Sequence, residues 1–155
     1  MVKTILLPTD GSAQANQAAL AGVGFARELG AELIGIYVAP RYQYPIYVEA
    51  IPPNFPAQDE YEASMRETGE IYLAGMRKAA TDAGLKFGGT TIFSDATAQA
   101  IADTAHAAHC DLIFMGSHGR GGLARLLLGS VTSRVLALSR IPVLVYRTKE
   151  QPDAN

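Results

Sequence analysis

The chain has 155 residues, of which 48% are hydrophobic and 18% are charged, and these values predict one globular domain with a full core. The formal net charge of −2 argues against nucleic-acid binding, which normally needs a basic surface. No apolar run approaches the roughly 20 residues that span a bilayer, and no signal-peptide pattern precedes the first strand, so we expect a cytoplasmic protein.

The first third of the chain alternates between strand and helix patterns. An unbroken apolar run predicts a strand over 3–8, of the kind that helices cover on both faces. Ser12 is placed to cap a helix over 13–29, which Gly30 can end. A second strand is expected over 32–39.

The next segment, 41–56, has an unusual composition. Together with Pro40 it holds five of the eight prolines, and it holds three of the seven tyrosines, at Tyr42, Tyr44 and Tyr47. A connection of this length inside a compact domain is usually functional or mobile. Two interpretations stay open: a flexible connection with aromatic side chains resting on the surface, or a lid or partner-binding surface.

A long helix is expected over 57–83, ending at Gly84. Its apolar side chains recur at helical spacings, which predicts one buried face made of Tyr61, Met65, Tyr72, Met76, Ala80 and Ala83. A weaker strand pattern covers 85–93. After it, Ser94 or Asp95 is placed to cap a further helix.

Cys110, His106 and His109 lie near the end of that further helix. A single cysteine excludes an internal disulfide, and its position just before a buried strand favours an inert thiol over a redox-active one, which would need exposure and positive charge nearby. The two histidines are three positions apart, but zinc sites normally use three or four ligands. No further cysteine or acidic cluster accompanies them, so we expect no metal site.

The stretch 112–147 combines a buried strand, a glycine-rich loop, a helix and a last strand. The first strand covers 112–115, Ser130 heads a helix over 131–138, and the last strand begins at Ile141. The loop holds glycines at positions 116, 119, 121, 122 and 129. Glycine lets a backbone approach an anion closely, and the free N–H groups and positive dipole of a helix start stabilise it. This arrangement predicts phosphate binding.

Strands and helices alternate along the whole chain, which predicts an α/β fold: an open, doubly wound parallel sheet with helices on both faces. Ligands of such sheets bind beyond the carboxyl ends of the strands, where the strand order reverses. Three common motifs are absent. No lysine between Lys86 and Lys149 completes a P-loop, the first strand–helix turn lacks the dinucleotide-binding glycines, and Ser117 lacks the first glycine of G-x-S-x-G.

The spacing G-x2-G-x9-G-S, from Gly116 to Ser130, resembles the nucleotide-binding signature of the ATP-binding branch of the universal stress protein family. The segments 5–12, ILLPTDGS, and 141–145, IPVLV, resemble the first strand with its turn and the last strand of that family. The resemblance covers 1–147 as a single domain and leaves 148–155 as a polar tail. It implies five strands in the order 3-2-1-4-5, similar to the adenine nucleotide alpha hydrolase fold.

In that order the first and fourth strands are neighbours, so Asp10 and Gly116 should face one cleft. The resemblance implies that Asp10 accepts hydrogen bonds from the ribose hydroxyls, that residues at the strand ends hold the adenine, and that backbone N–H groups and the Ser130 hydroxyl hold the phosphates. The expected nucleotide-binding residues are Pro8, Thr9, Asp10, Val38, Met115, Gly116, His118, Gly119, Arg120, Gly129, Ser130 and Val131. We expect one of His118, Arg120 and Arg125 to touch a phosphate.

We therefore expect an ATP-binding regulatory or stress-response protein, with Mg²⁺ carried on the phosphates. No acid pair or base is evident, so we assign no catalytic residue. The alternatives are a slow ATP phosphohydrolase or phosphotransferase, and an adaptor that keeps the fold without the ligand. In the family that the chain resembles, the last strand pairs with its copy, which implies a homodimer through 141–147. The sequence does not identify the signalling partner, and it indicates neither nucleic acid nor membrane as one.

Overall fold

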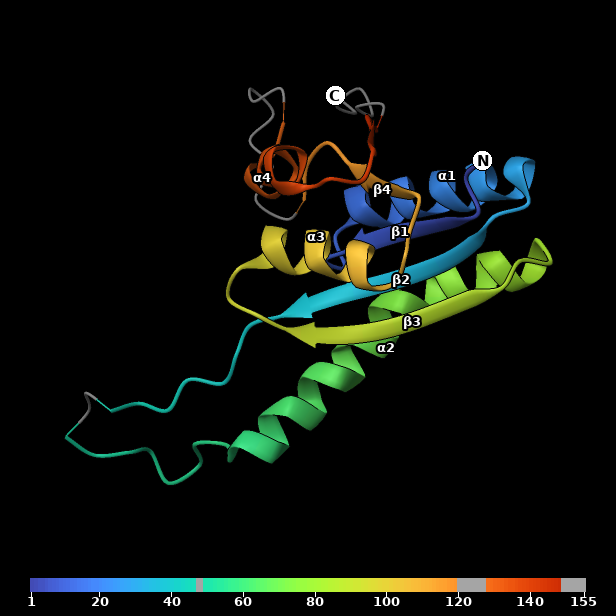
Figure 1. Cartoon of the computed structure of the whole chain (residues 1–155). Helices are drawn as coiled ribbons and strands as arrows, with labels where there is room; N and C mark the ends of the chain where they lie inside the picture. The colour runs from blue at the N-terminus through green and yellow to red at the C-terminus, as the bar shows by residue number, and fades with distance from the viewer. Residues whose placement is uncertain (47–48, 120–127, 149–155) are drawn as a thin grey trace, which may run out of the picture.

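The computed structural model describes residues 1–46, 49–119 and 128–148, and Figure 1 shows how the elements are arranged. Strands and helices alternate through this part of the chain, as the sequence predicts. In chain order the elements are β1 (Thr4–Thr9), α1 (Ala13–Leu29), β2 (Glu32–Ala39), α2 (Gln58–Asp82), β3 (Phe87–Phe93), α3 (Thr97–Ala107), β4 (Leu112–Gly116), α4 (Ser130–Leu138) and β5 (Val143–Tyr146).

The strands form one five-stranded parallel sheet in the order β3-β2-β1-β4-β5, which confirms the predicted fold. Central strand β1 pairs with β2 on one side and with β4 on the other. The chain moves outward from β1 to β3, crosses back to the far side of β1, and finishes at the opposite edge with β5. The order reverses between β1 and β4, and ligands of such sheets bind beyond the strand ends at that point.

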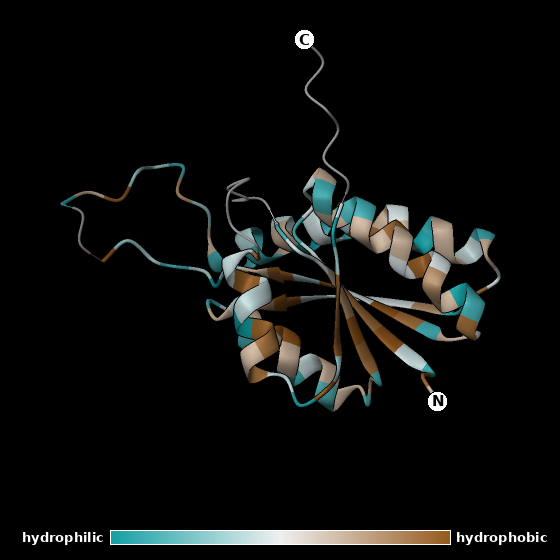
Figure 2. Ribbon diagram, turned by 90° about the horizontal axis from the view of Figure 1, so that it is seen from above, coloured by the Kyte–Doolittle hydropathy of each residue, from teal (hydrophilic) through white to brown (hydrophobic). Residues whose placement is uncertain are grey.

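Helices cover both faces of the sheet, as Figure 2 shows. Helices α1 and α2 pack on the face to which Ile5, Leu7 and Phe114 point. Helices α3 and α4 pack on the other face, to which Leu6 and Ile113 point. Because side chains alternate along a strand, burial on both faces requires apolar residues at successive positions. This explains the unbroken apolar runs in the sequence.

The predicted boundaries of α1 are confirmed by its caps. The Ser12 hydroxyl accepts a hydrogen bond from the Ala15 N–H at 3.1 Å, which satisfies one of the donors that helix geometry leaves without a partner. At the other end Gly30 adopts a left-handed conformation with a φ of 66°. The Ser12 cap lies in the turn between β1 and α1, where Asp10 also lies.

The predicted caps of α3 and α4 are wrong. The N-cap residue of α3 is Ala96, and neither Ser94 nor Asp95 caps the helix. The Ser94 hydroxyl instead accepts from the Ala96 N–H at 3.1 Å, and the Asp95 carboxylate accepts from the Arg41 N–H at 3.0 Å. These side chains stabilise the loop before the helix. The N-cap of α4 is Gly129, so that Ser130 is the first residue of the helix and not its cap.

Two strands are shorter than predicted, and the backbone bonding explains both differences. The Leu85 N–H donates to the Ala80 carbonyl at 2.9 Å, which places Leu85 in the turn that closes the end of α2, so β3 begins only at Phe87. At Ile141 both the N–H and the carbonyl bond to the Ser139 hydroxyl, at 3.0 and 2.7 Å. Ile141 is therefore a turn residue and β5 begins two residues later.

The buried face of α2 overlaps the predicted face only in part. Its buried residues are Gly69, Leu73, Met76 and Ala80, of which only Met76 and Ala80 were expected. The other expected residues, Tyr61, Met65, Tyr72 and Ala83, are half-buried. None of the described helices, α2 included, combines the length and apolar character that crossing a membrane requires.

The segment between β2 and α2 projects from the body of the fold (Figure 1). Its two ends are joined near the body, where Tyr42 donates a hydrogen bond to the Pro56 carbonyl at 2.8 Å and Tyr61 donates to the Pro40 carbonyl at 2.9 Å. Tyr47 lies outside the described residues. Whether this segment is a lid, a partner-binding surface or a connection stays a prediction.

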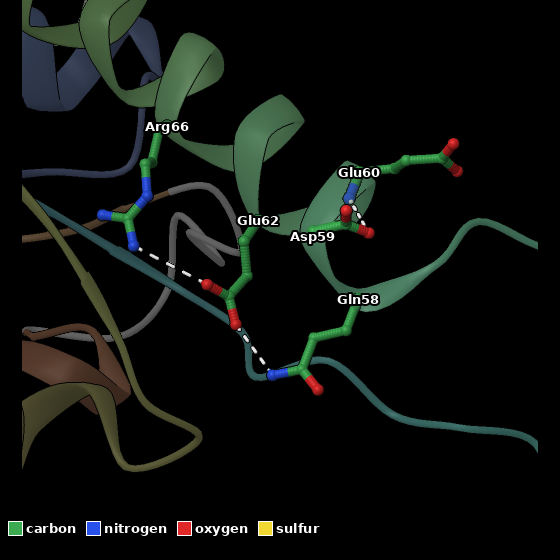
Figure 3. A network of polar contacts seen from close by, with 5 residues as sticks. All are labelled: Gln58, Asp59, Glu60, Glu62 and Arg66. Atoms are coloured by element: carbon green, nitrogen blue, oxygen red, sulfur yellow. Dashed lines mark hydrogen bonds and ion pairs between the residues drawn. The ribbon is translucent and has the colours of Figure 1, made fainter.

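Polar contacts along the first turns of α2 run beside that segment (Figure 3). Glu62 accepts a hydrogen bond from Gln58 at 2.9 Å and pairs with Arg66 at 3.6 Å, one turn further on. Exposed pairs of this kind contribute only about 0.3–0.5 kcal/mol each. They support the helix where it extends beyond the sheet, as expected for a solvated face.

Candidate functional site

A cavity of about 520 Å³ opens beyond the carboxyl ends of β1, β2 and β4, and we call it the strand-end cavity. Its volume lies within the range of roughly 300–1,000 Å³ that is typical of small-molecule sites. The lining residues are Pro8, Thr9, Asp10, Ala15, Ile36, Val38, Thr97, Ile101, Met115, Gly116, His118, Gly119, Gly129, Ser130, Val131 and Thr132.

Every predicted site residue that the structure describes lines this cavity. Arg120 and Arg125 lie outside the described residues. Sequence reasoning missed Ala15, Ile36, Thr97, Ile101 and Thr132. Part of this wall could have been found from periodicity: residues two apart on a strand share a face, as Ile36 and Val38 do, and residues four apart on a helix do the same, as Thr97 and Ile101 do.

Asp10 is held in a tight turn directly after β1. Its Oδ1 accepts a hydrogen bond from the Ser12 N–H at 2.9 Å, and the Thr9 hydroxyl accepts one from the Gly11 N–H at 3.1 Å. Gly11 has a φ of 78°, and a Cβ atom there would overlap the ring of Tyr72 on α2. The turn is therefore fixed by its own hydrogen bonds and by the helix packed against it.

Gly119 brings the loop after β4 into contact with Asp10. A Cβ atom added to Gly119 would lie 2.5 Å from Oδ2 of Asp10, closer than real Cβ contacts. Gly116 is also closely approached, because a Cβ atom there would lie 3.3 Å from both Ala18 Cβ and the His118 carbonyl oxygen. Gly119 therefore lets the loop approach Asp10, and Gly116 lets the end of β4 pack closely against α1.

Two hydrogen bonds join the start of α4 to the end of β4. The Thr132 hydroxyl donates to the Gly116 carbonyl at 2.9 Å, and the Gly129 N–H donates to the Ser117 carbonyl at 2.7 Å. The second bond corrects one expectation, because the Gly129 N–H is engaged within the protein and is not directed at a phosphate. Helix geometry leaves the N–H groups of residues 130–132 without intrahelical acceptors.

Ser117 and His118 lie side by side at the end of β4. The Ser117 hydroxyl and Nδ1 of His118 are 3.1 Å apart, within hydrogen-bond distance. Ser117 is buried and does not line the cavity, whereas His118 does. Ser117 therefore contacts the histidine ring from outside the cavity, and its hydroxyl is not placed to act as a nucleophile on a ligand in the cavity.

The cavity has an apolar half and a polar half on opposite sides of β1. The apolar half lies where β2 and α3 meet, and the polar half is formed by the loop after β4 and the start of α4. Asp10, at the end of the central strand, lies between the two and is the only carboxylate among the described lining residues. No cluster of three or more His, Cys, Asp or Glu side chains suited to a metal ion occurs in residues 1–46, 49–119 and 128–148.

Comparison with known proteins identifies the family. The model of the universal stress protein family matches residues 1–147. Universal stress protein MJ0531 from Methanocaldococcus jannaschii is 34% identical over 152 residues, which cover 95% of this chain and 83% of the relative.

Solved structures agree with this assignment. Hypothetical protein MJ0577 superposes with a TM-score of 0.80 at 29% identity, over 97% of this chain and 99% of that one. A universal stress protein in complex with cAMP has a TM-score of 0.67 at 22% identity, over 96% and 98% of the two chains. One from Archaeoglobus fulgidus in complex with dAMP has a TM-score of 0.59 at 18% identity, over 94% and 97%. The chain therefore belongs to the universal stress protein family.

Proposed function

We propose that this protein binds ATP in the strand-end cavity and acts in the cytoplasm as a nucleotide-dependent regulator of a stress response. The observation that carries the proposal is the order in which the apolar and polar lining residues follow one another across three neighbouring strands. Its apolar half, its carboxylate and its glycine-rich half follow one another from β2 through β1 to β4. Base, sugar and phosphates follow one another in the same order along a nucleotide.

Each part of the wall suits its part of the ligand. The side chains of Ile36, Val38 and Ile101 in the apolar half offer contact to the faces of a base. Met115, at the end of β4, adds apolar surface on the other side of β1. Asp10 Oδ2 lies beside Gly119 in the cavity wall, where it can accept hydrogen bonds from ribose hydroxyls. The first-turn N–H groups and positive dipole of α4 favour phosphate oxygens.

The two nucleotide complexes among the solved structures support this choice of ligand. Both cAMP and dAMP carry adenine, and both are bound by members of this fold. At 22% and 18% identity the likeness shows the fold alone, so the choice of ATP depends on the cavity of this chain.

We propose binding without fast turnover. Hydrolysis needs a group that orients the attacking water and groups that stabilise the transferred charge, and the only carboxylate among the described lining residues, Asp10, is assigned to the sugar. A magnesium ion would be held mainly by phosphate oxygens and water, which requires no dedicated protein ligands. Slow ATP phosphohydrolase or phosphotransferase activity is the alternative, and a phosphate-release assay on the purified protein tests it.

The proposal is tested by calorimetric titration with ATP and with 2′,3′-dideoxy-ATP, in the presence of Mg²⁺. Because a hydrogen bond to a charged group contributes about 1.5–3 kcal/mol, Asp10→Asn should weaken ATP binding by roughly ten- to a hundredfold. The wild type should prefer ATP to the dideoxy compound, and Asp10→Asn should lose that preference. Asp82→Asn, at the exposed end of α2, is the control. Absence of ATP binding at millimolar concentration would refute the proposal and favour an adaptor.

We also propose that two copies associate through residues 141–147. Strand β5 is the edge of the sheet, and no other described strand pairs with its outer side. Exposed edges of apolar strands tend to pair with another strand. The family resemblance implies pairing of this strand with its copy in a second subunit.

A further inference from the structure

Thr97 is the one polar side chain in the apolar half of the strand-end cavity among the residues that the structure describes. It is the first residue of α3, it is half-buried, and it lines the cavity. Its neighbours along this part of the wall include Ile36, Val38 and Ile101. A hydroxyl in such surroundings can form a stronger hydrogen bond than one in water, because the local dielectric constant is low.

The hydroxyl of Thr97 is also available to a ligand. The other two threonine hydroxyls of the wall bond within the protein: Thr9 accepts from the Gly11 N–H at 3.1 Å, and Thr132 donates to the Gly116 carbonyl at 2.9 Å. In the described part of the chain Thr97 Oγ1 takes part in no such bond. A half-buried hydroxyl without a protein partner is favourable if the bound molecule supplies the partner.

We infer that Oγ1 of Thr97 accepts a hydrogen bond from the 6-amino group of the bound adenine. The inference rests on the proposed function, since it assumes that the base occupies the apolar half of the cavity. Flat apolar contacts hold the two faces of a base but do not distinguish one purine from another. Discrimination requires a polar group at the edge of the ring, and Thr97 is the side chain placed to supply it.

A double-mutant cycle tests this contact by pairing two ligands with two proteins. The ligands are ATP and purine riboside 5′-triphosphate, which lacks the 6-amino group. The proteins are the wild type and Thr97→Val, in which a methyl group replaces the hydroxyl at nearly constant volume. Calorimetric titration gives the four dissociation constants, and their ratio isolates the contact between the hydroxyl and the amino group.

The wild type should bind ATP about three- to tenfold more tightly than the analogue, the range expected for one neutral hydrogen bond. Thr97→Val should bind both ligands with equal affinity, close to that of the wild type for the analogue. Thr97→Ser, which retains the hydroxyl, should keep the preference. Melting curves of all three proteins verify that the start of α3 is folded.

Two results would overturn the inference. If Thr97→Val keeps the wild-type preference for ATP, another group contacts the 6-amino group, although the proposed function stands. If the wild type binds both triphosphates equally, no polar contact is made at that position and again only the inference fails. Failure of the wild type to bind either triphosphate would instead refute the proposed function, and this contact with it.

Discussion

Oδ2 of Asp10 lies so close to Gly119 that a Cβ atom on Gly119 would be 2.5 Å from it. The two residues are far apart in the sequence, and their approach brings the carboxylate proposed to bind the sugar against the proposed phosphate loop. Gly119→Ala would force the carboxylate or the loop to move, while the Ser12 N–H holds the other carboxylate oxygen at 2.9 Å. We expect the variant to bind ATP at least about tenfold more weakly, measured by calorimetric titration.

Gly75→Ala is the matched control for that variant. Gly75 lies in α2, away from the cavity, and a Cβ atom there would meet no atom within 4 Å. The control should bind ATP as the wild type does and should be slightly more stable, by about 0.5–1 kcal/mol, because alanine favours the helix. Equal affinity of Gly119→Ala and wild type would show that the approach of these two residues has no part in binding.

The meeting of Asp10 with the loop after β4 could be predicted, since the strand order places the ends of β1 and β4 side by side. What the sequence could not reveal is how the hydrogen-bonding groups are shared. The Gly129 N–H looked available for a phosphate, yet it bonds to the Ser117 carbonyl at 2.7 Å. Whether a backbone donor is free depends on the path of the surrounding loop, and that path is a tertiary property.

Helix α2 shows a second limit of pattern reading. The helical pattern of large side chains includes Tyr61 and Met65, which are half-buried, whereas Gly69 and Leu73 are buried. Gly69 carries no hydrophobic signal, but a Cβ atom there would overlap the hydroxyl of Thr91 on β3. The close approach of helix and sheet therefore selects a residue that hydrophobicity alone does not mark.

The thiol of Cys110 should react slowly in the folded protein. Burial, with a smaller contribution from the charge of Asp111, raises the pKa of Cys110 to about 11. Because an unperturbed cysteine has a pKa of about 8.5, the reactive thiolate should be less abundant by about two orders of magnitude near pH 8. Labelling with a chromogenic disulfide reagent should be slow in buffer and fast in denaturant. Equally fast labelling in both would contradict the buried position of this side chain.

Asp111 should make the stability of the fold depend on pH in the acid range. Its Oδ2 accepts hydrogen bonds from the Lys3 N–H at 2.7 Å and the Thr4 N–H at 3.0 Å, and these bonds hold the pKa of Asp111 below its ordinary value. A lowered folded-state pKa stabilises the protein above the ordinary pKa of about 3.9, and the stabilisation is lost as the pH falls through the lowered value.

Asp111→Asn isolates this contribution. Denaturant unfolding should show the variant less stable than the wild type at neutral pH, with the difference shrinking as the pH falls below about 4. Asp82→Asn, an exposed carboxylate paired with Lys78 at 2.6 Å, is the control for removing a surface charge. If the difference in unfolding free energy between Asp111→Asn and wild type stays constant down to the acid transition, the ionised carboxylate is not the source of that difference.

The proposed dimer makes a specific prediction about the outer side of β5. The Ile113 N–H donates to the Pro142 carbonyl and the Ser117 N–H donates to the Tyr146 carbonyl, both at 2.9 Å. Backbone groups of alternate residues in a strand face opposite sides, so the even-numbered positions face β4 and Val145 faces outward. The Val145 N–H should therefore bond across the dimer and not within the subunit.

Val145→Pro removes that N–H and leaves the bonds to β4 intact, since proline is tolerated on the open side of an edge strand. We expect the wild type to sediment as a dimer at micromolar concentration and Val145→Pro to sediment as a folded monomer. Val145→Thr, which keeps the N–H and the β-branched shape, should remain dimeric. A monomeric wild type would refute the dimer itself. A dimeric Val145→Pro would mean that the subunits associate through a surface other than this edge, because a strand that lacks its central outward donor cannot complete an intersubunit ladder.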